Sequence, residues 1–383
     1  MAEPLRVLLA GGGTAGHVNP LLATAAELTA RPGGAHVAVL GTDEGLESRL
    51  VPEAGLDLIR VPRVPLPRRP SADLARLPGR LRAAVRAATD AVDATGAEVV
   101  VGFGGYVATP AYLAARRRGL PVVVHEQNAR PGLANRLGAR WAAGVAVTFP
   151  STPLRAARGT TVVTGMPLRA PIQRLAAELA ADPRGRRAAG ARALGLDPER
   201  PTLLVTGGSL GAQRLNGAVA GCAQDLLDAG AQVLHLTGRD KGEPVRAAAG
   251  ATGERYQVRE YLSEMEHAYA CADLVLCRAG AVTVSELAAL GLGAVYVPLP
   301  IGNGEQRHNA GDVVAAGGGL LVEDAELDAG YVRERLVPLL TEPRRLVDMG
   351  RRAAAAGTRD GAARLADLVH TAAGREPREG ARG

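Results

Sequence analysis

A histidine follows a glycine-rich turn near the start of the chain. The segment GGGTAG (Gly11–Gly16) comes after the apolar run Leu5–Ala10, and His17 follows it. A buried strand, a turn with bare backbone N–H groups and the first turn of a helix together form a site at which proteins bind phosphate. The positive end of the helix dipole lowers the pKa of an imidazole placed there and favours its neutral form. His17 is therefore a candidate general base or substrate-orienting group.

A second glycine-rich turn, GGSLGA (Gly207–Ala212), follows the apolar run Leu203–Thr206. Two such units in one chain predict two similar α/β domains that face a shared cleft. Two other interpretations stay open. Each turn could serve only the close packing of a strand against a helix. The first could also bind a dinucleotide, although GGGTAGH lacks the fingerprint spacing and Asp43 comes too late after the second predicted strand.

Two further segments of the first half place flexible or polar residues directly after apolar runs. Gly102–Tyr106 (GFGGY) is a third glycine turn, and His125–Asn128 (HEQN) follows Val122–Val124. Polar side chains at the end of a buried strand are costly unless they face a cleft or form a network. We expect both segments to border a binding site. The alternatives are a purely structural turn and a structural polar network.

In the second half, the segment CRAGAVTVSE (Cys277–Glu286) combines the features of a nucleotide site. A strand ends, Gly280 turns, and we expect a helix to begin near Thr283. Its free N–H groups can hold a pyrophosphate, and Glu286 can accept from ribose hydroxyls. The competing interpretation is a capping box of Thr283 and Glu286, which needs no ligand. The following loop, Pro300–Asn309, carries amides and charges suited to a sugar.

The sequence lacks the groups of several other chemistries. It has no Asp-x-Asp pair to hold a divalent ion on a diphosphate, no Gly-x-Ser-x-Gly elbow and no Walker lysine loop. Its cysteines, Cys222, Cys271 and Cys277, are too few and too scattered for a disulfide framework or a metal cluster. We therefore expect a phosphate site without a metal or cofactor, and reduced structural thiols.

These candidate residues need parallel sheets to position them. Apolar, β-branched runs alternate with Ala-, Leu- and Arg-rich helical stretches, which predicts an α/β protein with two Rossmann-like, doubly wound domains. In the first half the predicted strands are Arg6–Ala10, Val37–Leu40, Leu58–Val61, Val99–Gly102, Val122–Glu126 and Val145–Val147. In the second half they are Thr202–Thr206, Val233–Leu236, Tyr256–Glu260, Leu274–Cys277, Ala294–Val297 and Gly319–Val322.

The length of 383 residues favours two domains over one core. We expect an N-terminal domain over residues 1–165 and a C-terminal domain over 166–357. A helix over 358–373 then returns to the N-terminal domain, and 374–383 form a disordered tail. No apolar run is long enough to span a bilayer, and Met1–Pro4 leaves no room for a signal peptide before the first strand. We therefore expect the protein in the cytoplasm.

The formal net charge of +6 comes almost wholly from arginine, since Lys241 is the only lysine. One region is especially rich in it: Arg60, Arg63, Arg68, Arg69, Arg76, Arg80, Arg82 and Arg86. Prolines and leucines lie between these arginines, which favours an amphipathic patch for an anionic membrane surface over a merely solvated face. Arg116–Arg118 would add to the patch. Nucleic acid is a poor fit because the aromatic content is only 3%.

Six segments in order resemble the MurG family, the peripheral-membrane glycosyltransferases of bacterial peptidoglycan synthesis. They are GGGTAGHVNP, GFGGYVATP, HEQNARPGLANR, GGSLGAQRLN, CRAGAVTVSE and PLPIGNGEQRHNA. The resemblance implies the GT-B architecture of two Rossmann-like domains. It also implies inverting transfer of N-acetylglucosamine from UDP-N-acetylglucosamine to the C4 hydroxyl of the muramyl sugar in lipid I, giving lipid II. Such an enzyme works without a cofactor at the cytoplasmic face of the cell membrane.

The resemblance also assigns residues. It implies contacts with UDP-N-acetylglucosamine from Thr14, Ala15, Gly16, Asn128, Arg169, Ser209, Leu262, Ala281, Val282, Thr283, Val284, Ser285, Glu286 and Gln306. On the acceptor side it implies Gly104, Gly105 and Tyr106. His17 and Glu126 are the two candidates for the general base, and neither the residues nor the resemblance chooses between them.

Four other functions compete with this one. A relative with a different acceptor would share every motif, and a UDP-N-acetylglucosamine 2-epimerase of similar two-domain shape would need no acceptor. A non-catalytic protein that binds a sugar nucleotide or scaffolds a membrane complex would leave His17 and the segment His125–Asn128 without a task. A dehydrogenase would need the acidic ribose contact that is missing after the second predicted strand.

Overall fold

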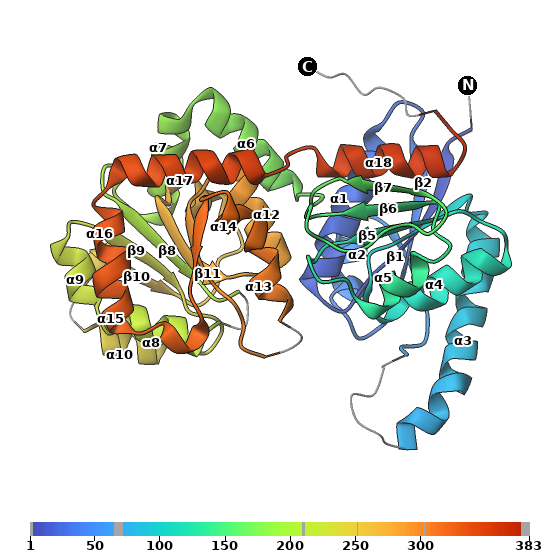
Figure 1. Ribbon diagram of the computed structural model, residues 1–383, viewed down its shortest axis with the longest axis horizontal. Coiled ribbons are helices and arrows are strands. Elements are labelled where there is room, and N and C mark those ends of the chain that lie inside the picture. The colour runs from blue at the N-terminus through green and yellow to red at the C-terminus, as the bar shows by residue number, and fades with distance from the viewer. Residues whose placement is uncertain (1–2, 65–71, 209–210, 251, 302–303, 377–383) are drawn as a thin grey trace. The chain divides into compact units, whose positions relative to one another are not determined.

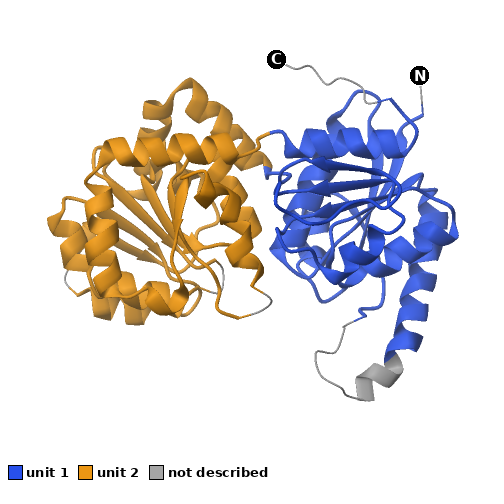
Figure 2. Cartoon of the chain, in the orientation of Figure 1, with its two compact units in different colours: residues 1–169, 360–383 blue, residues 170–359 orange. Residues whose placement is uncertain are grey.

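The protein is described by a computed structural model that covers residues 3–64, 72–208, 211–250, 252–301 and 304–376 (Figure 1). The chain forms two compact units (Figure 2). Unit 1 contains Met1–Arg169 together with Asp360–Gly383, and unit 2 contains Ala170–Arg359. The backbone therefore passes from one unit to the other twice. The end of the chain belongs to the same unit as its beginning.

Unit 1 has a seven-stranded sheet in the order β3-β2-β1-β4-β5-β6-β7, with every neighbouring pair parallel. Its strands are β1 Leu5–Ala10, β2 Ala35–Gly41, β3 Asp57–Arg60, β4 Val99–Gly102, β5 Val122–Glu126, β6 Gly144–Val147 and β7 Thr160–Val163. The central strands consist of continuous apolar runs that are buried on both faces, as covered parallel sheets require. The edge strand β7 is the one that the sequence analysis missed, because its TTVV run is short and half-exposed.

Unit 2 has a six-stranded parallel sheet in the order β10-β9-β8-β11-β12-β13. Its strands are β8 Thr202–Thr206, β9 Gln232–Leu236, β10 Tyr256–Arg259, β11 Leu274–Arg278, β12 Ala294–Val297 and β13 Gly319–Leu321. All the predicted strands of both halves are present, with ends shifted by at most two residues. The predicted fold class, two Rossmann-like α/β domains, is confirmed.

Helices flank both sheets. Those of unit 1 are α1 Ala15–Ala30, α2 Glu47–Glu53, α3 Ala72–Thr95, α4 Gly105–Arg117, α5 Leu133–Gly138 and α18 Gly361–Ala372. Those of unit 2 are α6 Ala170–Ala181, α7 Pro183–Leu194, α8 Gln213–Ala220, α9 Ala223–Asp228, α10 Gly242–Ala249, α11 Met265–Cys271, α12 Ala281–Leu290, α13 Glu305–Asn309, α14 Gly311–Ala315, α15 Ala329–Tyr331, α16 Val337–Leu340 and α17 Pro343–Ala356.

The order of each sheet reverses direction at one place, between β1 and β4 in unit 1 and between β8 and β11 in unit 2. Ligands of doubly wound sheets bind outside the carboxyl ends of the strands at this point. The two paired glycine turns follow β1 and β8, and the turns after β4 and β11 lie beside them. The topology thus brings the predicted site segments of each unit to one sheet edge.

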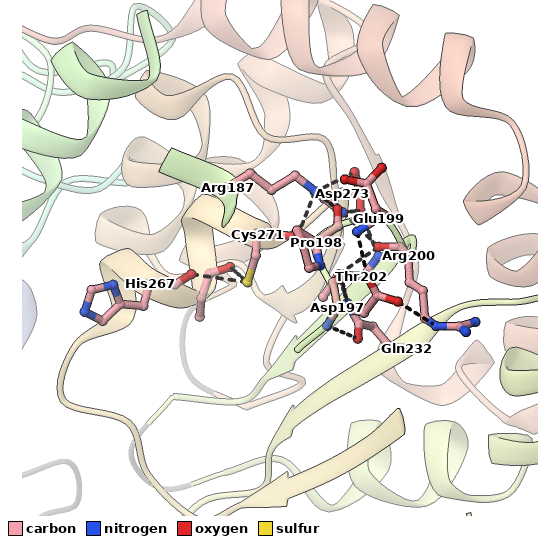
Figure 3. A network of polar contacts seen from close by, with 11 residues as sticks. Arg187, Asp197, Pro198, Glu199, Arg200, Thr202, Gln232, His267, Cys271 and Asp273 are labelled. Atoms are coloured by element: carbon pink, nitrogen blue, oxygen red, sulfur yellow. Dashed lines mark hydrogen bonds and ion pairs between the residues drawn. The ribbon is translucent and has the colours of Figure 1, made fainter. Parts of the chain in front are cut away.

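Arg187 of α7 holds the opposite end of the unit 2 sheet, where the amino ends of its strands lie (Figure 3). Its guanidinium donates to both carboxylate oxygens of Asp273, at 2.8 and 3.0 Å, and to the carbonyls of Pro198, Arg200 and Cys271. Asp273 also accepts from the backbone N–H of Thr202, the first residue of β8. Because five acceptors surround one cation, this network ties α7 to the amino ends of β8 and β11.

Helix α18 is bound to unit 1 through Arg31, which follows α1 and is 9% exposed. Its guanidinium donates to Asp367 at 2.7 Å and to the carbonyl of Ala363 at 2.6 Å, both in α18. A further bond joins it to Glu27 at 3.0 Å. Apolar residues of α18, including Leu365 and Val369, complete the hydrophobic core beneath it.

Replacing Arg31 with alanine should therefore loosen α18. Since charge-assisted hydrogen bonds contribute about 1.5–3 kcal/mol each, we expect Arg31→Ala to lower the unfolding free energy of unit 1 by about 2–3 kcal/mol. Trp141, the only tryptophan, lies in unit 1, so its fluorescence during urea unfolding reports on that unit alone. Arg49→Ala removes an exposed ion pair with Glu53 and should change stability by less than about 0.5 kcal/mol. Equal effects of the two variants would contradict the anchoring role of Arg31.

Candidate functional site

The first glycine turn presents its backbone at the start of α1. The helix begins at Ala15 after Thr14, and no hydrogen bond within the described structure uses the N–H groups of Thr14, Ala15 and Gly16. The N–H of Gly13, by contrast, donates to the carboxylate of Glu47 at 2.7 Å. The turn is therefore an anion-binding site that is partly filled by the protein itself, and the first helical N–H groups stay available.

His17 lies in the first turn of α1 and is half-buried. Its Nδ1 is 2.9 Å from the Thr14 hydroxyl. When Nδ1 carries the proton it donates to that hydroxyl, and Nε2 is left as the basic nitrogen. Burial lowers the pKa of His17 to about 4, although the nearby Glu47 charge and a hydrogen bond with the Gly12 backbone raise it. The imidazole is therefore neutral at physiological pH, which a general base requires.

The glycine turn after β4 lies against the first one. Gly104 has φ of 89°, and a Cβ there would lie 3.2 Å from Nε2 of His17. Gly105, with φ of 78°, faces the carbonyl of Gly12 so closely that a Cβ would come within 2.7 Å of it. Both positions therefore need glycine. Tyr106 is 39% exposed, and the Arg63 guanidinium stacks 5.0 Å from its ring centre.

Glu126, the other candidate base, is buried in a hydrogen-bond network at the end of β5. One carboxylate oxygen accepts from the N–H of Asn128 at 2.9 Å, and the other accepts from Gly132 and from the Asn135 amide, also at 2.9 Å. The residue is 1% exposed, and burial raises its pKa above the usual value while these hydrogen bonds oppose the rise. Glu126 thus fixes the loop around Asn128, and its oxygens have little freedom to accept a substrate proton.

The neighbours of Glu126 complete this network. Asn135 also donates to the His125 carbonyl at 3.0 Å and accepts from the Tyr112 hydroxyl at 2.7 Å. His125 is fully buried with its ring 5.4 Å from that of Phe103. Desolvation lowers the pKa of His125 to about 4, helped by the charge of His17 and opposed by the Gly165 backbone. A structural polar network, one of the two interpretations of this segment, is therefore present.

In unit 2, α12 begins at Ala281 with Gly280 as its N-cap. The sequence analysis placed this start near Thr283, two residues late. The capping-box interpretation is wrong, because Thr283 lies inside the helix and no side chain caps its N-terminus. The N–H groups of Ala281, Val282 and Thr283 take no part in the described hydrogen bonds. They form a free helix N-terminus at the carboxyl end of β11.

The remaining residues of this segment have different exposures. Val282, Thr283 and Ser285 are half-exposed, whereas Val284 packs inward. Glu286 is 3% exposed and accepts from the Tyr269 hydroxyl at 3.1 Å. Its carboxylate is therefore held in place near the start of α12.

The helix α13 is tied to the α12 turn. Its Asn309 donates to the carbonyl of Ala279 at 3.3 Å. Gln306, in the first turn of α13, accepts from the Leu299 N–H at 3.0 Å through its side-chain oxygen. The amide nitrogen of Gln306 takes no part in a described bond, so this side chain can still donate.

Three site residues lie elsewhere. Leu262 is half-buried in the loop after β10. Arg169 ends the first segment of unit 1, Met1–Arg169, whereas α12 belongs to unit 2. Ser209 lies outside the described residues. The described Gly211 has φ of 67° and touches the Thr237 carbonyl, which fixes the glycine at that position.

A cavity of about 690 Å³ opens in unit 2. Its walls are formed by the start of α8, by the loop after β12 and by the segment before α15, including Arg278 and Asp324, which form an ion pair at 2.6 Å. None of the described residues assigned to UDP-N-acetylglucosamine by resemblance lines it, but Gly211 and Ala212 of the second glycine turn and Pro300 and Ile301 of the predicted sugar-binding loop do. The cavity is large enough for a small ligand and borders two segments at which the sequence predicted binding.

Several arginines of the predicted membrane patch are already paired. Arg60 lies 2.5 Å from Asp43 and Arg63 lies 2.7 Å from Glu44, so acidic side chains offset part of the local charge. Arg82 and Arg86 are exposed on α3. Arg68, Arg69 and the side chain of Arg76 lie outside the described part of the chain.

Sequence reasoning missed Glu47 and Asn135, which organise the glycine turn and the β5 network. Neither stands in a glycine-rich segment, and a single glutamate in a helical stretch carries no local signal of burial. The motif HEQNARPGLANR does contain Asn135, so its polar character was visible without its partners. Their importance follows only from the contacts made in the fold.

Two family models match most of the chain. The N-terminal domain of glycosyltransferase family 28 matches residues 7–147, and the C-terminal domain of the same family matches residues 202–365. Among curated proteins, the UDP-N-acetylglucosamine–N-acetylmuramyl-(pentapeptide) pyrophosphoryl-undecaprenol N-acetylglucosamine transferase of a Nocardioides species is 54% identical, covering 95% of this chain and 97% of the relative. The protein of the same name from Clavibacter sepedonicus is 53% identical, covering 97% of both.

Solved structures agree with this similarity. The MurG crystal structure from Acinetobacter baumannii is 30% identical and covers 96% of this chain and 100% of its own, with a TM-score of 0.77. A UDP-GlcNAc 2-epimerase from Neisseria meningitidis has a TM-score of 0.66 but only 14% identity, over 96% of this chain and 100% of the epimerase. The second likeness concerns the fold alone.

The buried histidine of β5 makes the stability of unit 1 depend on pH. The pKa of His125 falls from 6.5 to about 4 on folding, so between these values the unfolded chain binds a proton that the folded unit does not. Stability therefore decreases as the pH falls through this window, and His125 accounts for about 2 kcal/mol between pH 7 and pH 5.

This dependence can be measured by urea unfolding followed through Trp141 at both pH values. His125→Phe removes the titrating group and should reduce the loss of stability between pH 7 and pH 5 by about 2 kcal/mol. His36→Phe, at an exposed position of β2, should keep the wild-type loss. If both variants keep it, His125 is not the group responsible.

Proposed function

The chain belongs to the MurG family within glycosyltransferase family 28, and we propose that unit 2 holds its nucleotide-sugar donor while unit 1 activates the acceptor. The protein is an N-acetylglucosaminyltransferase that transfers N-acetylglucosamine from UDP-N-acetylglucosamine to undecaprenyl-pyrophosphoryl-N-acetylmuramyl-pentapeptide. The observation that carries this function is the identity above 50% to transferases of that activity over nearly the full chain. An epimerase is not favoured, because the similarity to that class is limited to the fold.

The donor diphosphate is assigned to the N-terminus of α12. The N–H groups of Ala281, Val282 and Thr283 supply unsatisfied donors and the positive end of a helix dipole, which together bind phosphate without a metal ion. Glu286 and Ser285 then face the ribose, Leu262 offers its backbone to the uracil, and Gln306 donates to the sugar hydroxyls. Arg169, Ser209, Val284 and the segment Thr14–Gly16 remain assigned to the donor by family resemblance alone.

The reaction proceeds by direct displacement with inversion. The C4 hydroxyl oxygen of the muramyl sugar attacks the anomeric carbon, the bond from that carbon to the β-phosphate oxygen breaks, and UDP leaves with the electron pair. Negative charge grows on the β-phosphate and is stabilised by the α12 N–H groups. His17 accepts the hydroxyl proton at Nε2, beside Gly104. Gly105 and Tyr106 border the acceptor sugar, and Asn128 remains assigned to the donor by family resemblance.

His17 is favoured over Glu126 as the base on three observations. Its Nε2 lies beside Gly104, its lowered pKa keeps it neutral, and it lies in the first turn of a helix. Glu126 is committed to three protein donors. Its role is to position the loop that carries Asn128.

The acceptor is lipid-linked, so we place the protein at the cytoplasmic face of the cell membrane as a peripheral protein. Exposed arginines of α3, together with Arg116 and Arg117 at the end of α4, supply positive charge for an anionic surface, whereas Arg118 is paired with Asp93. No helix of the described residues is long and apolar enough to cross a bilayer. Nucleic acid has no part in this function.

The activity itself is tested with radiolabelled UDP-N-acetylglucosamine and a short-chain analogue of lipid I. We expect label in the lipid product, and much slower transfer from UDP-N-acetylgalactosamine. Incubation with donor alone should release no epimer. Epimerisation without an acceptor would instead establish the 2-epimerase, and binding of UDP without any transfer would indicate a non-catalytic protein.

Replacing the base should slow the chemical step without weakening nucleotide binding. General-base catalysis contributes about 10²–10⁴ in rate, so His17→Ala should lower kcat by that factor. The Kd of UDP, measured by calorimetry, should stay within about twofold because the groups proposed for the diphosphate, ribose and uracil at α12 and Leu262 lie in unit 2. His36→Ala serves as the exposed histidine control. Turnover within a few-fold of wild type in His17→Ala would show that another group accepts the proton.

A further inference from the structure

Glu47, which no family motif contains, is a fully buried carboxylate beside the first glycine turn. It is the first residue of α2 and is 0% exposed. One of its oxygens accepts from the Gly13 N–H at 2.7 Å, and the other accepts from the N–H of Thr42 at 3.1 Å and from its hydroxyl at 2.8 Å. Its place at the N-terminus of a helix further favours the negative charge.

The surrounding backbone is shaped around this carboxylate. A Cβ at Gly12 or at Gly45 would overlap the carboxylate oxygens, and a Cβ at Gly41 would lie 2.7 Å from its Cγ. Three glycines, one from the first glycine turn and two from the segment just before Glu47, therefore leave the space that Glu47 fills. Glycine at position 12 is explained by a protein side chain rather than by a ligand.

The position of the carboxylate is the one that a phosphate takes in comparable turns. In such turns an anion binds to N–H groups between a buried strand and a helix. Here Gly13, whose φ is 89°, gives its N–H to Glu47 instead. This hydrogen bond holds the turn on one side. His17 lies only four residues after Gly13, in the first turn of the helix that follows.

We propose that Glu47 is a positioning residue for the transfer reaction: it fills the anion position of the first glycine turn and so fixes the turn that carries His17. The inference rests on the proposed role of His17 as the base. It predicts that no part of a substrate diphosphate uses the Gly13 N–H. The negative charge of Glu47 has a second effect, because it raises the pKa of His17 above the value that burial alone would give.

The charged groups around His17 are few. Glu47 raises its pKa, and His125 is the other titratable group that interacts with it. The other described contacts of His17 are with the Thr14 hydroxyl, the Gly12 backbone and Gly104, none of which titrates near neutral pH. Glu47 is therefore the one anion among them that can tune the base.

The test is Glu47→Gln, which keeps the size of the side chain but turns an acceptor at Gly13 or Thr42 into a donor. Because a misplacement of about 1 Å can cost 10²-fold in rate, we expect kcat to fall about 100-fold. The Kd of UDP should stay within twofold, and Glu47→Asp should recover part of the rate. The matched control is Glu53→Gln, an exposed residue of the same helix, which should keep kcat within twofold.

A double-mutant cycle separates positioning from a general loss of structure. If Glu47 acts through His17, adding Glu47→Gln to His17→Ala should lower kcat by less than about threefold. A full further 100-fold loss in the double variant would overturn the proposal, as would a wild-type kcat in Glu47→Gln alone. A wild-type kcat in His17→Ala would instead overturn the proposed base.

If Glu47→Gln does not fold, Thr42→Val tests the positioning role of Glu47 instead. It removes only the hydroxyl that donates to Glu47 and keeps the shape of the side chain. We expect a several-fold lower kcat with unchanged UDP affinity. An unchanged kcat would show that the hydrogen bond from the Thr42 hydroxyl to the Glu47 carboxylate does not contribute to the reaction.

Discussion

Backbone N–H groups at the carboxyl ends of parallel strands must find partners, and this constraint governs both units. Most strands lead into a helix whose first N–H groups have no partner within the helix. In unit 1 two buried carboxylates accept from N–H groups that precede such helices: Glu47 from Gly13 before α1, and Glu126 from Asn128 and Gly132 before α5. The first N–H groups of α1 stay free. In unit 2 the N-terminus of α12 has no such side chain. The groups that the protein leaves unsatisfied are those available to a substrate.

The turn after β1 in unit 1 and the turn after β11 in unit 2 therefore differ in chemistry. The turn of unit 1 is closed on one side by an internal anion and carries a neutral imidazole, which suits the activation of a hydroxyl. In unit 2 the strand beside the glycine turn leads into a free helix N-terminus, which suits a leaving diphosphate. The two units share a topology, but the backbone N–H groups at the carboxyl ends of their strands have different partners. Unit 1 therefore carries a base, and unit 2 carries an anion site.

Burial sets the charge state of the site in unit 1. His17 and His125 have pKa values near 4, because desolvation disfavours their charged forms. The same desolvation raises the pKa of Glu126, and the cost of keeping a carboxylate there is offset by three donated hydrogen bonds. The sequence predicted that these polar groups face a ligand. In the fold, some of them hold the loop and others reach the surface.

The sequence by itself determined the parallel strands, the glycine turns and the family, because continuous apolar runs and positive-φ glycines leave local signals. It missed β7, whose half-exposed residues have no clear apolar pattern, and it misplaced the start of α12, because Gly280 caps the helix without a side chain. Only the tertiary structure decided what Glu47 and Glu126 do. A glutamate has the same local signal whether it faces water or backbone N–H groups, and only the fold brings the distant Gly13 to the carboxylate of Glu47, beside the nearby Thr42.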